Sequence, residues 1–336
     1  MRYFLITTGR RGPSRNVGCA VIADGLRYLI RQADPHAIFH VVDQDVHRPQ
    51  DWEYMQAVGG CLVFAGNPRL NSVAGSNQHC DRDIWGHIAA ARDAGLRTAD
   101  LSVGATYYLP LQALDTMAAE MLALPKVLET LAHEAAMDLV ITRDPLMQAL
   151  VSTVRDDAAL LPCASWWAKD YRGVHWQPKR RHAIAIKRLP GHEWILKAIR
   201  GTLERLSADR ETLLVGHDAD DYRWLAAHAP DLASRMDVYS EVRGLLGCYA
   251  ETSRLVSFRL HATIPALSLG ARVTHIALDS RHLCLEPWGI ASQIFEALLE
   301  RDEIELRDDR PEGGFNPEAA EAAYVRLLRS HLLEAR

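Results

Sequence analysis

The chain has no apolar run long enough to cross a membrane, which would require about 18 consecutive apolar residues. Its first ten residues, MRYFLITTGR, lack the basic segment and the long apolar core of a signal peptide. Six cysteines are scattered through the 336 residues without a Cys-x-x-Cys pair, which favours reduced thiols over a disulfide framework or a zinc site. These absences predict a cytoplasmic protein without a membrane span.

The sequence also lacks an excess of positive charge. Its 38 Lys and Arg residues are outnumbered by 43 Asp and Glu residues, and the formal net charge of −5 argues against nucleic acid as the main partner. A short basic run, Lys179-Arg180-Arg181, is interpreted as a solvated linker edge. Because no group of metal-ligating residues occurs at a recognised spacing, we expect no metal and no other cofactor. The oligomeric state stays open.

The sequence does contain a regular alternation of short apolar runs and helical patterns, which is typical of parallel sheets covered by helices. Its length and its 48% hydrophobic content fit two ordinary domains. We therefore expect an α/β protein with two Rossmann-like, doubly wound domains that face a cleft. The expected units are residues 1–175, residues 176–315 and a C-terminal helix, 316–336, that packs back on the body.

Several elements can be placed before the site is considered. The pattern predicts one long helix over 112–135 and a last helix with Asn316 as N-cap and Pro317 at its first position. Ligands in open α/β sheets gather at the carboxyl ends of strands, so polar residues at those ends are the candidates for function. The expected strands are Tyr3–Thr7, Ile38–Val42, Cys61–Phe64, Arg97–Leu101, Leu139–Ile141, Ala183–Ile186, Thr212–Val215, Val238–Tyr239, Arg254–Ser257 and Val273–Ala277.

The most informative strand end is LVSFRLHATIPALSLG, residues 255–270. Arg259 and His261 lie there between a buried strand and a buried helix, where unpaired charges cost free energy. The arginine can bind a phosphate or carboxylate, and a histidine kept neutral by the helix dipole can relay a proton. The alternative is that an internal acid pairs with the arginine. Pro265 requires that the helix either begins near Thr263 or is kinked.

Two further arginines follow expected strands. Arg143 stands beside Asp144-Pro145, where Asp144 is explained as a helix N-cap, and Arg281 lies just past the strand that ends at Ala277. The alternative for each arginine is an ion pair with a neighbouring acid. If the three strand-end arginines converge, they can hold one compact anion that carries several charges.

These segments resemble the polysaccharide pyruvyl transferase family. The family's Ser-x-Arg-Leu-His segment is similar to residues 257–261, and its Tyr-Asp-x-Lys segment is similar to LDSR at 278–281. Its Arg-Asp segment is similar to TRDP at 142–145, and its N-terminal Asn-x-Gly-Asp loop and helix are similar to RNVGCAVIADGLRYLI at 15–30. The similar segments run through both halves of the chain in the family's order.

The resemblance implies a fold similar to GT-B glycosyltransferases, with the active site between the two domains. It also implies phosphoenolpyruvate as donor and a sugar or glycan acceptor, lipid-linked acceptors included. The pyruvyl group would be transferred as a ketal and phosphate released. We expect Arg259 and His261 to act in catalysis, since arginines stabilise a departing phosphate and a neutral histidine can transfer a proton. The donor-binding positions implied are Arg143, Arg259, Leu260 through its backbone N–H, His261 and Arg281.

The acceptor side is expected around the start of the chain and near the linker. Aromatic faces commonly stack on sugar rings, but Trp166, Trp167 and Trp176 are equally explained as packing residues. The polar segment 64–81 suits an acceptor-facing loop or an ordinary surface loop, and LLVGHDADD at 213–221 suits a helix capped by Asp218. The acceptor-binding residues that we expect are Asn16, Cys19, Asn67, Trp166 and His217.

Two departures from the family's pattern leave alternatives open. Cys19 stands where the family has Asp, and Arg281 replaces a lysine, which keeps the charge and changes its shape. One alternative is a glycosyltransferase of the same fold whose arginines bind the diphosphate of a nucleotide sugar. The other is a catalytically silent family member that binds an anionic glycan.

Overall fold

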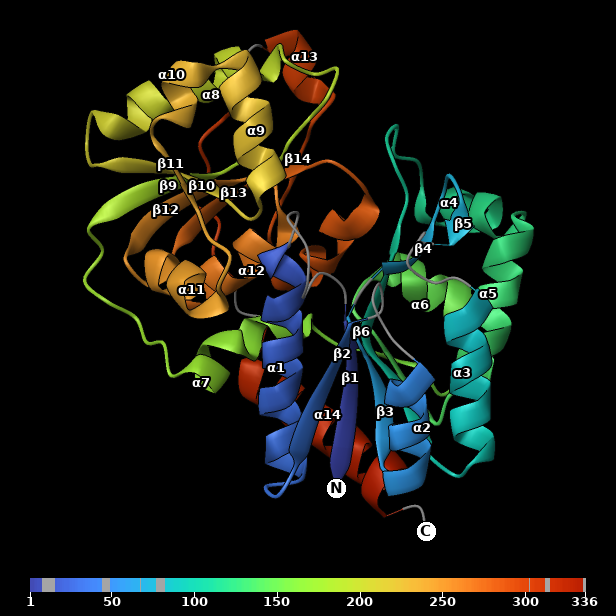
Figure 1. The fold of residues 1–336 in the computed structure, drawn as a ribbon. Coiled ribbons are helices and arrows are strands. Elements are labelled where there is room, and N and C mark those ends of the chain that lie inside the picture. Colours follow the sequence, from blue (N-terminus) through green and yellow to red (C-terminus); the bar gives the residue numbers. More distant parts are fainter. Residues whose placement is uncertain are drawn as a thin grey trace.

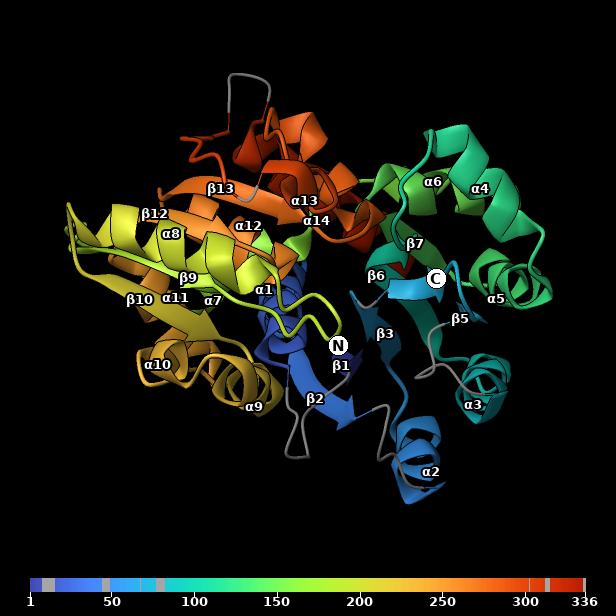
Figure 2. The ribbon, with the colours of Figure 1, turned by 90° about the horizontal axis from the view of Figure 1, so that it is seen from above.

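Figure 1 shows two α/β halves, each built on a sheet that is covered by helices. The computed structural model describes residues 1–7, 16–43, 49–66, 68–76, 82–301, 303–311 and 315–334. Viewed from above in Figure 2, the helices α8, α9 and α10 lie on the second half and α3, α4 and α5 on the first. The expected α/β class and the doubly wound, two-sheet arrangement are confirmed.

The first sheet has a parallel core in the order β2-β1-β3-β6-β7-β8. The strand order reverses between β1 and β3, so the carboxyl ends of these strands mark a switch point where such sheets bind ligands. Two short strands extend the sheet beside the end of β6, with β4 parallel to β6 and β5 antiparallel to β4. The strands are β1 (Arg2–Thr7), β2 (Ile38–Asp43), β3 (Cys61–Ala65), β4 (Pro68–Asn71), β5 (Gly75–Ser76), β6 (Arg97–Thr106), β7 (Leu139–Thr142) and β8 (Ala159–Leu160).

The second sheet is parallel throughout its described part, in the order β11-β10-β9-β12-β13-β14. This is the strand order of the dinucleotide-binding fold, and its switch point lies between β9 and β12. The strands are β9 (Arg181–Ala185), β10 (Thr212–Gly216), β11 (Met236–Val238), β12 (Thr252–Ser257), β13 (Arg272–Ala277) and β14 (Gln293–Ile294).

Helices connect these strands and cover the faces of both sheets. No described helix is long and apolar enough to cross a membrane. The helices of the first half are α1 (Val17–Ala33), α2 (Pro49–Val58), α3 (Arg82–Asp93), α4 (Leu114–Leu122), α5 (Pro125–Ala135), α6 (Pro145–Val151) and α7 (Ala168–Arg172), with the 3₁₀ turn η1 (Ala164–Trp167). Those that follow are α8 (Ile195–Ser207), α9 (Ala219–His228), α10 (Pro230–Ala233), α11 (Val242–Ala250), α12 (Leu260–Ser268), α13 (Ala297–Arg301) and α14 (Pro317–Leu328), with the turns η2 (Ser280–Cys284), η3 (Glu286–Trp288) and η4 (Arg329–Leu333).

Helix α1 joins the two halves. It packs against α7, α14 and η1 and also against α11 and α12 of the second half. One apolar cluster therefore contains Leu5 and Val63 of the first sheet together with Ala185 and Leu255 of the second. The C-terminal helix α14 lies against α1, and the Tyr324 hydroxyl donates to the carbonyl of Pro162 at 2.9 Å. Burial of these apolar surfaces fixes the two carboxyl edges relative to each other.

Two helix predictions need correction. The single helix expected over 112–135 is two helices, α4 and α5, because Pro125 has no N–H to continue α4 and instead occupies the first turn of α5. Helix α12 begins at Leu260 and keeps Pro265 inside it, so it does not begin near Thr263. The caps at Asp144, Asp218 and Asn316 are confirmed, since each carboxylate or amide oxygen accepts a backbone N–H of the first helical turn.

Candidate functional site

The carboxyl edges of the two sheets meet, and charged residues from both lie at the junction. We call Arg143, Lys187, Arg259, His261 and Arg281 the strand-end cluster. Direct contacts join the halves here. Val17 N donates to the carbonyl of His217 at 3.2 Å, and Tyr107 and Ser280 exchange two hydrogen bonds of 2.8 and 2.9 Å. The junction thus brings charged residues of both domains together.

Arg143 follows β7 and is 2% exposed. Its Nη1 donates to the carbonyl of Gly66 at 2.6 Å and lies 3.4 Å from His261 Nε2. Its Nε and Nη2 have no hydrogen-bond partner among the described residues. Gly104 allows the guanidinium to lie against β6, because a Cβ at that position would be 2.8 Å from Arg143 Nε. Arg143 is therefore a buried cation with two unsatisfied donor atoms.

His261 stands in the first turn of α12, facing Arg143. Because a guanidinium only donates, the 3.4 Å contact requires that Nε2 of His261 accepts, which is the role it has in the neutral ring. Burial lowers the pKa of His261 well below its ordinary value, and the nearby Arg143 lowers it further. Gly18 gives the ring room, since a Cβ there would be 3.1 Å from Nδ1. His261 is thus a neutral imidazole whose Nε2 lone pair faces Arg143.

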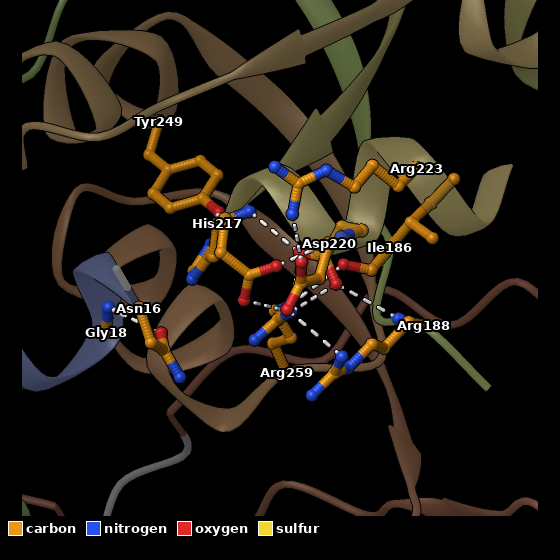
Figure 3. A network of polar contacts seen from close by, with 11 residues as sticks. Asn16, Gly18, Ile186, Arg188, His217, Asp220, Arg223, Tyr249 and Arg259 are labelled. Atoms are coloured by element: carbon orange, nitrogen blue, oxygen red, sulfur yellow. Dashed lines mark hydrogen bonds and ion pairs between the residues drawn. The ribbon is translucent and has the colours of Figure 1, made fainter. Parts of the chain in front are cut away.

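Arg259 has the paired arrangement that the sequence left as an alternative. Its Nη2 donates to both carboxylate oxygens of Asp221 at 2.5 Å and contacts Asp218 at 3.3 Å, while its Nε donates to the carbonyl of Ile186 at 2.9 Å. Figure 3 shows Arg259 within the polar network that includes Arg188, Asp220 and His217. Two acids at the start of α9 compensate this cation. A direct role of Arg259 in donor binding or catalysis stays a prediction.

Arg281 is also paired. Its Nε and Nη2 donate to the two carboxylate oxygens of Asp279 at 2.7 and 2.5 Å, and its backbone N–H donates to the same carboxylate. Burial would raise the pKa of Asp279, but Arg281 overcomes this effect and holds that pKa well below its ordinary value. The pair fixes the guanidinium of Arg281 rigidly at the end of β13, and its donor-binding role stays a prediction.

Lys187 is a cluster member that the sequence analysis missed. It lies two residues after β9, at the switch point of the second sheet. Burial, helped by the nearby Arg281, lowers its pKa to about 8. Arg259 and Arg281 act electrostatically on both Lys187 and His261, which places all four groups in one electrostatic neighbourhood. The available signal was the position of this lysine directly after an expected strand.

The residues predicted for the acceptor are spread more widely. Asn16 caps α1 by accepting from Gly18 N at 2.9 Å, and the half-buried Cys19 lies in the same first turn. His217 turns into the second domain, where its Nε2 lies 2.9 Å from the Tyr249 hydroxyl. Asn67 lies outside the described residues. These acceptor contacts stay predictions.

Trp166 lies mostly within the core, and its acceptor role stays a prediction. It is 8% exposed and packs edge-on against Trp288 and Phe315, with ring centroids 5.4 and 4.7 Å apart. Each ring therefore shields the other from water in the core shared by η1, η3 and the segment before α14. Packing, the alternative that the sequence left open, explains this residue.

The fold defines the class of protein first. The structure is similar to MnaA of S. aureus solved with UDP (TM-score 0.57, 12% identity, covering 98% of this chain and 96% of that one). It is also similar to a putative UDP-N-acetylglucosamine 2-epimerase of Listeria monocytogenes (TM-score 0.58, 12% identity, covering 100% of this chain and 97% of that one). The UDP-GlcNAc 2-epimerase of Neisseria meningitidis is similar as well (TM-score 0.56, 11% identity, covering 98% of this chain and 100% of that one). At this identity the similarity concerns the fold alone, which is GT-B-like.

The sequence then identifies the family. Residues 16–280 match the polysaccharide pyruvyl transferase family, and the chain belongs to that family. The search of curated proteins found no significant match. The matched range includes Asn16 and four members of the strand-end cluster, and it ends one residue before Arg281.

Proposed function

We propose that the protein transfers the pyruvyl group of phosphoenolpyruvate to a sugar or glycan acceptor, lipid-linked acceptors included, and forms a ketal. The observation that carries the proposal is Arg143. A buried guanidinium with two unsatisfied donor atoms is costly in the empty protein, and a bound anion would satisfy it. Family membership supports the same reaction class.

The donor would lie between Arg143 and the start of α12. Phosphoenolpyruvate carries a carboxylate and a phosphate, and both are suited to the fork of an arginine. The backbone N–H groups of Leu260 and His261, at the first two positions of α12, have no partner among the described residues. Helix starts of this kind bind anions. Arg143 and these two amides thus offer donors from both halves to one ligand.

Charge and proton balance assign the other roles. Protonation of the methylene carbon makes C2 electrophilic, one sugar hydroxyl attacks C2, and phosphate leaves as the second hydroxyl closes the ketal. Of the two protons released by the hydroxyls, one replaces the proton given to the methylene and the other leaves with hydrogen phosphate. The Lys187 ammonium would donate to the methylene, and the neutral His261 would accept from the attacking hydroxyl. Arg259 and Arg281, fixed by their aspartates, would stabilise the developing charge.

The test compares ligand stabilisation of the wild type and Arg143→Gln. Phosphoenolpyruvate at 100 times its Kd should stabilise the wild type by about 2.7 kcal/mol, which calorimetry or fluorescence detects as a rise in Tm. Arg143→Gln should lose this rise. Arg200→Gln, which alters an exposed arginine of α8 paired with Asp231, is the matched control and should keep it.

Product formation completes the test. Phosphate release that depends on both phosphoenolpyruvate and a glycan, with a ketal detected by mass spectrometry, is the expected result. Stabilisation by UDP and not by phosphoenolpyruvate would contradict the proposal and favour a nucleotide-sugar enzyme. Glycan binding without product, under conditions in which phosphoenolpyruvate binds, would favour a silent family member.

A further inference from the structure

A charged pocket lies at the edge of the second sheet opposite the strand-end cluster, where β9, β12 and β13 begin. Its volume is about 480 Å³. Five of its lining side chains are Lys or Arg and one is Asp, and none of them belongs to the strand-end cluster. Strands of five or six residues separate the two edges, a distance of roughly 17–20 Å. The pocket is therefore distinct from the proposed active site.

The most exposed aromatic side chain at this pocket is Trp176, in the segment between α7 and β9 (Figure 1). It is 58% exposed, whereas Trp166 and Trp167 nearby in the sequence are buried. Gly270 lies under the indole, since a Cβ there would be 3.5 Å from Trp176 Cδ1. Lys179 Nζ lies 5.8 Å from the ring centroid. A flat aromatic ring beside a cation is thus presented to solvent.

Lys179 carries a charge that no described carboxylate compensates. Its Nζ donates to the carbonyls of Ala250 at 3.1 Å and Leu269 at 2.7 Å, which fix the ammonium in place. Burial lowers the pKa of Lys179 to about 8. An ammonium held by neutral carbonyls retains its full attraction for an anion.

The arginines around the pocket are only partly compensated. Arg254 and Arg272 share the single carboxylate of Asp308, at 2.6 and 2.9 Å. Arg310 is exposed and forms no hydrogen bond or ion pair with the described residues. Arg210 donates to the carbonyl of Lys179 at 2.5 Å, and its Nε is 3.8 Å from Asp209. The pocket thus keeps a net positive charge in a protein whose overall charge is −5.

Polar groups suited to hydroxyls complete the lining. The Ser253 hydroxyl lies 2.8 Å from His182 Nδ1, and His182 Nε2 lies 3.2 Å from Asp209. Of these three residues only His182 is buried. The Ser253 hydroxyl also donates to the carbonyl of Arg181 at 3.0 Å, which fixes its orientation at the pocket. An aromatic ring, hydroxyl-bonding groups and several cations together match a ligand that has sugar rings, hydroxyls and carboxylates.

We propose that this pocket is a second carbohydrate-binding site that takes acidic glycan chains. Trp176 stacks on a sugar ring, and Lys179, Arg210 and Arg310 bind the carboxylates of the chain. The inference goes beyond the transfer reaction, because it assigns a site that holds a polymer away from the strand-end cluster. Polysaccharide is favoured over nucleic acid by the family's substrate class and by the net negative charge of the chain.

Calorimetry with an oligogalacturonide, a carboxylate-bearing glycan, tests the site on the full chain without phosphoenolpyruvate. Trp176→Ala should weaken binding roughly tenfold, as loss of a central aromatic contact does. Arg310→Gln should weaken it roughly threefold and reduce its sensitivity to salt. Tyr222→Ala and Arg200→Gln, which alter exposed residues of α9 and α8, are the matched controls and should leave the Kd unchanged.

The outcomes separate this proposal from the proposed function. An oligogalacturonide that does not bind, or that binds Trp176→Ala as tightly as the wild type at an unchanged Tm, overturns the site. Equal binding of a neutral maltooligosaccharide overturns the role of the cations, and preferred binding of oligouridylate reassigns the pocket to nucleic acid. Failure of ketal formation in the transfer assay would leave the binding result standing, since no donor is present here.

Discussion

The two halves of the molecule treat their strand-end arginines differently. In the second half Arg259 and Arg281 are each fixed by aspartates of their own domain, with guanidinium–carboxylate distances of 2.5–2.7 Å to Asp221 and Asp279. In the first half Arg143 is buried more deeply and forms no ion pair within 4 Å among the described residues; it contacts the carbonyl of Gly66 and His261 Nε2, and the buried carboxylate of Asp144 acts on it electrostatically. An arginine at the end of a parallel strand therefore has two roles. In the second half it belongs to the framework, and in the first half it is available to a ligand.

The two halves differ in whether a carboxylate pairs directly with the strand-end arginine. A buried pair contributes little net stability but is costly to break, whereas a cation held by a carbonyl keeps most of its charge for a partner that arrives later. The second domain thus provides a rigid surface whose charges are already balanced. The first domain supplies a cation without a direct ion pair among the described residues, compensated only at longer range by the buried Asp144. Variants in each half test this difference between framework arginines and a ligand-binding arginine.

The largest effect is expected for Asp221→Asn. Asp221 is fully buried and holds Arg259, and it also accepts the backbone N–H groups of Arg188 and His217. Its neutralisation leaves Arg259 with only the longer contact to Asp218, so the free energy of unfolding should fall by about 3 kcal/mol in urea titrations. Asp220→Asn, one position earlier and partly exposed, is the control and should cost less than about 0.5 kcal/mol. Equal losses of unfolding free energy in Asp221→Asn and Asp220→Asn would contradict the framework role of Asp221.

The next effect concerns catalysis at Lys187. A general acid must be protonated, so kcat should be constant below about pH 8 and fall as the pH rises through the lowered pKa of Lys187. Lys187→Gln should lower kcat by roughly 10²-fold or more and remove this falling limb. Lys126→Gln, an exposed lysine of α5, should keep both the rate and the profile. A falling limb that persists in Lys187→Gln assigns the titration to another group.

The sequence predicted more of the fold than of the site. The apolar runs predicted most of the parallel strands, because buried strands need continuous apolar residues. Asp144, Asp218 and Asn316 correctly predicted three helix N-caps. The ion pairs of the arginines could not be predicted from the sequence. Asp221 lies 38 residues from Arg259, and only the fold brings this carboxylate to that guanidinium. Trp166 and Trp176 likewise look alike in sequence, while tertiary packing buries one and exposes the other.

A smaller effect is expected for Arg281→Lys, which restores the residue that the family commonly has. An ammonium cannot match the two-point contact that Arg281 makes with Asp279, so the pair should loosen. We expect kcat/KM to fall roughly threefold to tenfold, with the change mainly in KM for phosphoenolpyruvate. Arg281→Gln, which removes the charge and leaves Asp279 uncompensated, should be clearly worse. A gain in activity for Arg281→Lys would show that the geometry of this arginine is not adapted to its site.

The smallest effect is expected for Arg143→Gln in the absence of ligand, and it decides the comparison most directly. The substitution loses the bond to Gly66 and the attraction to Asp144, but it also removes a buried charge with two unsatisfied donor atoms, and these changes oppose each other. The free energy of unfolding should therefore change by less than about 1 kcal/mol, while Arg259→Gln, which breaks a buried pair, should cost about 3–5 kcal/mol. Urea titrations of both variants without phosphoenolpyruvate provide the measurement. If Arg143→Gln is as costly as Arg259→Gln, then Arg143 is part of the framework as well, and its unsatisfied donor atoms no longer support donor binding.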